Sequence, residues 1–166
     1  MRGWFAYALY QQMKKNKDII LITGDLGYKV FDDIRDEMPD QFINTGAAEQ
    51  AMMGIAVGLA LEGKIPFVYS ITPFLLYRPF ETIRTYINHE KIPVKLIGSG
   101  RDKDYLHDGF SHDATDAREL FWSEYDVYRG IFGNINDLWP DTKEEIPELV
   151  ERMLKTKEPY FLSLRR

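Results

Sequence analysis

Residues 42–71, FINTGAAEQAMMGIAVGLALEGKIPFVYSI, place a strand, a helix and a second strand in direct succession. Residues 42–43 predict a short strand, residues 48–62 a helix closed by Gly63, and residues 66–71 the next strand. The helix is apolar nearly all round and rich in Ala and Gly. We therefore expect it to lie inside the protein or an interface, where small residues allow close backbone approach.

The same alternation continues on both sides of this stretch. Helices are predicted over 4–13, 73–90, 114–122 and 142–156, and strands over 19–22, 94–97, 127–132 and 160–164. Nearly continuous apolar strands that alternate with helices favour an α/β fold with a doubly wound, mostly parallel sheet and helices on both faces. We expect one domain over residues 1–166, because the length suits one domain and no linker or repeat interrupts it.

Ligands of such sheets bind outside the carboxyl ends of the strands. The loops expected there are residues 24–27, 44–46, 72–74 and 98–113. The chemistry of the protein is therefore expected in these loops.

Composition argues against several classes of function. The net charge of -5 disfavours nucleic acid as a partner, and the lack of cysteine excludes disulfides and thiolate sites. The three histidines form no HxxxH pair, so no metal site is expected on this chain. No apolar run reaches the roughly 18 residues of a membrane span, and no signal-peptide layout opens the chain. We expect a cytoplasmic protein that does not contact a membrane.

Glu49 stands at the start of the most hydrophobic predicted helix. A glutamate in a first turn can serve only to favour the helix dipole. Burying a carboxylate among Ala, Met and Ile, however, is costly unless a partner compensates it. Burial also disfavours the ionised form, so a buried glutamate can hold or share a proton near neutral pH. We interpret Glu49 as a catalytic acid–base group.

Several short motifs occur in a fixed order: TGDLG at 23–27, the stretch quoted above, TPF at 72–74, YRPFETIR at 77–84 and DGFSH at 108–112. Their order and spacing resemble the pyrimidine-binding domain of the transketolase family of thiamine-diphosphate enzymes, over the whole chain. Deoxyxylulose-phosphate synthases and the beta subunits of 2-oxoacid dehydrogenases share this order. The resemblance implies the thiamine-diphosphate-binding fold and a transferase component that moves a two-carbon ketol unit.

The resemblance also implies cofactor contacts. In the family, a glutamate at the position of Glu49 hydrogen-bonds the aminopyrimidine ring of thiamine diphosphate and stabilises its imino tautomer. Phe74 is expected to stack on that ring, Tyr77 to extend the stack, and Asp25 to lie near the cofactor rings. The alternatives are ordinary core packing for Phe74 and Tyr77 and a turn between glycines for Asp25.

Substrate contacts are implied at the end of the chain and in the DGFSH loop. By resemblance, Asp108 contacts a sugar hydroxyl and His112 lines the substrate channel, where a histidine can shuttle protons near pH 7. Arg165 and Arg166 match a terminal phosphate-binding arginine. The alternative for His112 is a surface residue in a loop.

Some positions depart from the family pattern. Ile71 stands where an aromatic residue is frequent, Gly100 where transketolases carry a histidine for the substrate phosphate, and Phe110 and Ser111 where they carry Pro and Thr. The lost histidine leaves open whether the substrate is phosphorylated.

The magnesium and diphosphate motif of the family, GDG…N, is missing. GDLG at 24–27 begins in the same way, but no Asn follows at the required 25–30 residues. Magnesium ligands are therefore expected on a diphosphate-binding partner domain or subunit, with the cofactor between the two. We predict a dimer or hetero-oligomer that is inactive as a single chain, with the helix over 48–62 packed on the partner. A natural split subunit is the expectation, with a truncated longer chain as the alternative.

Other functions remain as alternatives. One is a 2-oxoacid decarboxylase or dehydrogenase beta-type component, so the small-molecule substrate is either a sugar or a 2-oxoacid. The others are a non-catalytic scaffold and an unrelated flavodoxin-like domain. The DGFSH loop favours transketolase chemistry, Glu49 argues against a scaffold, and TGDLGYKVF is a poor phosphate-binding loop.

Overall fold

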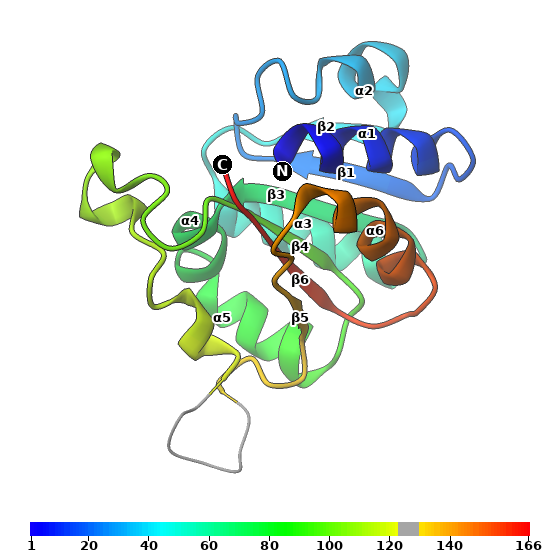
Figure 1. The fold of residues 1–166 in the computed structure, drawn as a ribbon. Coiled ribbons are helices and arrows are strands. Elements are labelled where there is room, and N and C mark those ends of the chain that lie inside the picture. The colour runs from blue at the N-terminus through cyan, green and yellow to red at the C-terminus, as the bar shows by residue number, and fades with distance from the viewer. Residues whose placement is uncertain (123–129) are drawn as a thin grey trace.

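The computed structural model describes residues 1–122 and 130–166. Its centre is a six-stranded sheet in the order β2-β1-β3-β4-β6-β5, and the neighbouring strands pair in parallel (Figure 1). The strands are β1 (Ile19–Thr23), β2 (Phe42–Asn44), β3 (Ile65–Ile71), β4 (Lys95–Ser99), β5 (Asn136–Leu138) and β6 (Tyr160–Leu164). The α/β fold with a parallel sheet is thereby confirmed.

Helices cover both faces of the sheet. The longer ones are α1 (Arg2–Met13), α2 (Asp32–Glu37), α3 (Glu49–Leu61), α4 (Thr72–Tyr77), the π-helical η2 (Ile83–His89) and α6 (Ile146–Leu154). Short turns are α5 (Phe80–Thr82) and the 3-10 segments η1 (Pro39–Gln41), η3 (Leu106–Asp108), η4 (Phe110–His112), η5 (Ala117–Leu120) and η6 (Lys143–Glu145).

The apolar strands supply two cores. In β1, Ile19 and Leu21 pack in the core beneath α1 and α6, whereas Ile20 and Ile22 pack in the core beneath α3. Successive side chains of a strand point to opposite faces, so a continuous apolar run serves both cores. This explains why the buried strands carry no polar alternation.

Two predicted helices are shorter in the structure. The helix expected over 73–90 is divided into α4, α5 and η2. Pro79 lies at the break. Proline lacks the backbone N–H that a continuous helix needs, so the helix is interrupted there. The helix expected over 114–122 is reduced to η5, and α2 was not predicted from the sequence.

The strand predicted over 127–132 is wrong for residues 130–132, and its remaining residues lie outside the described ones. There the chain turns, with the N–H of Gly130 donating to the carbonyl of Phe121 and that of Phe132 to Leu120. The strand is instead β5, at the edge of the sheet. Its sequence, Asn-Asp-Leu, contains no apolar run that could have marked it.

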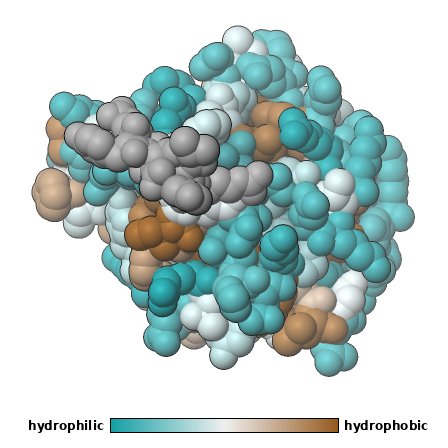
Figure 2. Space-filling view, turned by 90° about the horizontal axis from the view of Figure 1, so that it is seen from below, coloured by the Kyte–Doolittle hydropathy of each residue, from teal (hydrophilic) through white to brown (hydrophobic). Residues whose placement is uncertain are grey.

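One face of the molecule, on the side of α5, is largely hydrophilic, and apolar residues appear there only as separate patches (Figure 2). Within residues 1–122 and 130–166, no helix has both the length and the apolar character that crossing a bilayer requires.

A buried lysine lies at the start of β4, at the end of the sheet opposite the site loops. Lys95 is 1% exposed, and its ammonium group donates to the backbone carbonyls of Thr156 and Glu158. Burial lowers the pKa of Lys95 to about 8, and the Glu158 carboxylate opposes this only in part.

Lys95 should make stability depend on pH. The unfolded chain keeps this proton up to its ordinary pKa of 10.5, whereas the folded chain loses it near pH 8, so stability rises with pH between these values. From pH 8 to 9.5, the free energy of unfolding should rise by about 1.5 kcal/mol more in the natural protein than in Lys95→Met. Urea unfolding at both pH values measures this, and an equal response of the two proteins would contradict it.

Candidate functional site

Glu49 is the first residue of α3, and its side chain is buried, with 2% exposed. The Ser70 hydroxyl donates to its Oε1 at 3.0 Å, and Nη1 of Arg78 donates to its Oε2 at 2.7 Å. The burial predicted from the sequence is confirmed. Two donors compensate the carboxylate, which is the condition for keeping a charge inside a protein.

Phe74 lies in α4 and meets two other side chains. The guanidinium carbon of Arg78 lies 3.8 Å from the centroid of the Phe74 ring, which is a cation–π distance. The His112 ring lies 4.7 Å from that centroid, at an interplanar angle of 65°. Arg78 therefore joins Glu49 to Phe74, and His112 extends this cluster through its contact with the Phe74 ring.

Close packing of α4 on β4 positions this cluster. The Thr72 hydroxyl donates to the carbonyl of Gly100 at 2.6 Å, which ties the start of α4 to the end of β4. A Cβ atom on Gly98 would lie 2.6 Å from Oγ1 of Thr72 and 2.9 Å from Cε2 of Phe161. Only glycine at this position lets the helix approach so closely.

Tyr77 is directed toward Asp116. Burial raises the pKa of Tyr77. The Asp116 carboxylate raises this pKa further, through a hydrogen bond and through its negative charge. The described ring contacts of Phe74 are with His112 and Arg78, not with Tyr77. Tyr77 thus lies next to the cluster, and its contact with a cofactor ring stays a prediction.

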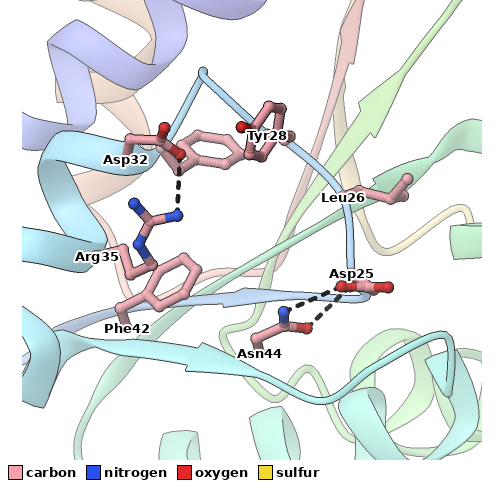
Figure 3. A pocket seen from close by; sticks show the side chains of 9 residues that line it. Asp25, Leu26, Tyr28, Asp32, Arg35, Phe42 and Asn44 are labelled. Carbon is pink, nitrogen blue, oxygen red and sulfur yellow. Dashed lines mark hydrogen bonds and ion pairs between the residues drawn. The ribbon is translucent and has the colours of Figure 1, made fainter.

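Asp25 follows β1 in the left-handed region, with φ 59°. Its N–H donates to Oδ1 of Asn44 at 2.9 Å, and the Asn44 amide donates back to Oδ1 of Asp25 at 3.3 Å (Figure 3). Both residues line a cavity of about 150 Å³ together with Tyr28, Arg35 and others. Gly24, which precedes Asp25, packs against Glu49, since a Cβ there would lie 3.6 Å from Oε1.

The remaining predicted residues form contacts elsewhere at the carboxyl ends of the strands. Oδ2 of Asp108 lies 3.4 Å from Nε2 of His107, and a guanidinium nitrogen of Arg166 lies 3.2 Å from the same nitrogen. Arg165 lies 3.7 Å from the carboxylate of Asp102. The side chains of Asp108, Arg165 and Arg166 therefore contact His107 and Asp102, not Glu49 or Phe74.

The position of the family histidine is Gly100, with φ 84°. The next residue, Arg101, is buried and donates to the hydroxyl and carbonyl of Ser163. Burial lowers the pKa of Arg101. Its hydrogen bonds serve the packing of β4 against β6.

No group of three or more His, Asp or Glu side chains within residues 1–122 and 130–166 is arranged to hold a metal ion.

Arg78 is the site residue that sequence reasoning missed. Two signals pointed to it. It stands four residues after Phe74, the spacing at which helical side chains meet, and a buried glutamate needs a cation. The distance between Arg78 and Glu49 in the sequence hides their contact, because this contact forms only when the fold brings the end of α4 to the start of α3.

Proteins of known family resemble this chain in sequence. A subunit of apulose-4-phosphate transketolase from Actinobacillus succinogenes is 30% identical over 128 residues, covering 77% of this chain and 39% of that protein. Its counterpart from Phocaeicola vulgatus is 28% identical, covering 99% of this chain and 51% of that protein. The chain therefore spans between two fifths and half of the length of these relatives.

Solved structures show the same fold. A structure described as "Split gene transketolase, inactive beta4 tetramer" matches with a TM-score of 0.81 and 28% identity, over 99% of this chain and 51% of that chain. Transketolase from Leishmania mexicana matches with a TM-score of 0.81 at 18% identity, over 99% of this chain and 25% of that chain. The family model "Transketolase, pyrimidine binding domain" matches residues 1–166. The chain belongs to the family of transketolase pyrimidine-binding domains.

Proposed function

We propose that this chain supplies the pyrimidine-binding half of a thiamine-diphosphate-dependent transketolase that transfers a two-carbon ketol unit. The observation that carries the proposal is the Glu49–Phe74 pair. One planar guanidinium group contacts the carboxylate at 2.7 Å and the ring at 3.8 Å. The space between the two side chains thus suits a flat, nitrogen-containing ring such as an aminopyrimidine.

In this proposal, Glu49, Phe74 and His112 have different roles. When bound, thiamine diphosphate supplies the nucleophilic carbon that attacks a carbonyl substrate. Glu49 would hold or move a proton at a ring nitrogen, from a rigid position at the start of α3. Phe74 would orient the ring by stacking, which contributes about 0.5–1.5 kcal/mol beyond burial. His112, in contact with Phe74, would face the substrate and exchange protons near neutral pH.

Other predicted contacts lie around this centre. Asp25 follows Gly24, which packs against Glu49, and Tyr77 lies one helical turn beyond Phe74. Both remain proposed cofactor contacts. Asp108, Arg165 and Arg166 remain proposed substrate contacts, and their charges suit a polar or anionic substrate.

We propose that a second domain or subunit holds the diphosphate and its magnesium. The two relatives named above are each described as one subunit of a transketolase. In addition, α3 has an open face: a Cβ on Gly54 or Gly58 would have no neighbour within 4 Å among residues 1–122 and 130–166, and Ile55 and Leu61 are 40% and 68% exposed. An apolar face of this kind suits a protein partner. The partner would complete the enzyme, which this chain alone would not form.

Reconstitution tests the proposal. Calorimetry with thiamine diphosphate and magnesium is carried out on this chain, on a diphosphate-binding subunit that carries GDG…N, and on their mixture. Tight binding is expected only in the mixture, because each chain holds one end of the cofactor. Full turnover by the single chain, or no binding by mixtures that form a complex, would overturn the proposal. Offering the mixture ketoses and 2-oxoacids separately distinguishes transketolase from decarboxylase chemistry, and the DGFSH loop favours the ketose.

A further inference from the structure

Arg78 combines three properties. Its side chain is 45% exposed, it pairs with a carboxylate that is only 2% exposed, and its guanidinium carbon lies 3.8 Å from the centroid of the Phe74 ring. It follows the last residue of α4 and precedes Pro79, at the point where the helix breaks. A long side chain at a helix end, partly open to solvent, can leave its position without moving the core.

A guanidinium group presents a planar N–C–N edge with N–H donors. An aminopyrimidine ring presents a similar planar edge of ring nitrogen, carbon and amino group. Either group can donate an N–H from that edge to a carboxylate while its flat face lies on an aromatic ring. Arg78 donates from Nη1 to Oε2 of Glu49 and places its guanidinium carbon over the Phe74 ring, so it covers Phe74 surface beside Glu49.

We infer that Arg78 is an internal substitute for the aminopyrimidine ring. In the free chain its guanidinium group occupies the position of that ring, and Arg78 leaves this position when the ring binds. This inference rests on the proposed function. Two planar groups cannot share one 3.8 Å contact with the same ring surface. The apparent affinity for the pyrimidine is therefore the intrinsic affinity multiplied by the fraction of chains in which Arg78 has left this position.

The test compares the natural chain with Arg78→Met and with a matched control, Arg84→Met. Methionine keeps a long apolar side chain without the guanidinium. Arg84 is exposed on the neighbouring η2, and no described contact joins it to Glu49 or Phe74. The probe is 4-amino-5-hydroxymethyl-2-methylpyrimidine, followed by NMR titration at millimolar concentration. Arg78→Met should bind it about tenfold more tightly than the natural chain and the control, since a cation–π contact and a charge-assisted hydrogen bond no longer compete.

A second measurement does not depend on the variant. The Nε–H resonance of Arg78 in the natural chain should carry the ring-current shift of Phe74 and lose it as the probe binds. Equal affinities in all three chains, a resonance that stays unchanged at saturation, or no binding to any of the three chains would overturn the inference. Each of these results leaves the proposed function standing, since that function is decided by cofactor binding in the mixture with the partner subunit.

Discussion

Replacing Glu49 with Gln should lower the turnover of the reconstituted complex by about 10²- to 10⁴-fold, the range that a positioned acid–base group contributes. Glutamine has nearly the same size and can still accept the hydrogen bond from Ser70, but it cannot take up or release a proton. The loss should therefore appear in kcat, with the fold retained. Steady-state ketol transfer by the mixed subunits measures it, with circular dichroism as the check on folding.

Glu62→Gln is the matched control. Glu62 is the C-cap of the same helix, α3, and it is exposed, so the same substitution there removes an equal charge far from Phe74. Its turnover should stay within about twofold of the natural complex, since isolated surface charges contribute little. If Glu49→Gln kept more than a tenth of the turnover, Glu49 would not be the acid–base group.

Phe161→Ala should lower the free energy of unfolding by about 3–5 kcal/mol, the cost of removing a buried aromatic ring and leaving a cavity. The Phe161 side chain in β6 is fully buried. Its ring stacks on Phe121, with centroids 4.7 Å apart at 14°, and meets Trp139 edge to face at 5.4 Å. Urea unfolding measures the change.

Phe110→Ala provides the comparison for this substitution. Phe110 lies in the DGFSH loop and is 88% exposed, so its removal should change the free energy of unfolding by less than about 0.5 kcal/mol. Similar losses for the two variants would show that the aromatic cluster around Phe161 is not a main source of stability.

The sequence predicted the elements that are continuous in hydrophobicity. The largely apolar runs of β1, β3, β4 and β6 and the helix α3 were found because burial on both sides leaves few polar side chains. The edge strand β5 was missed because a strand with one free edge carries polar residues. The break at Pro79 was also missed, although a proline inside a helix removes a backbone N–H that the helix needs.

The parts of the site that depend on one residue and its sequence neighbours were predictable. The burial of Glu49 followed from its apolar neighbours, and the placement of Phe74 and His112 in one site followed only from the family resemblance. Arg78 was not predicted, because its pairing with Glu49 depends on tertiary approach over 29 residues. The direction of Asp108, toward His107 rather than His112, depends on the successive 3-10 turns η3 and η4, which no sequence period reveals.

The Glu49–Arg78 ion pair joins two residues of one chain. A domain whose buried acid was balanced only by a cofactor would bear an uncompensated charge until that cofactor arrived, at a cost of several kcal/mol. This chain carries its own counter-charge in Arg78, so it can fold before any ligand binds next to Glu49. The fold should therefore form without any bound ligand to balance the charge of Glu49.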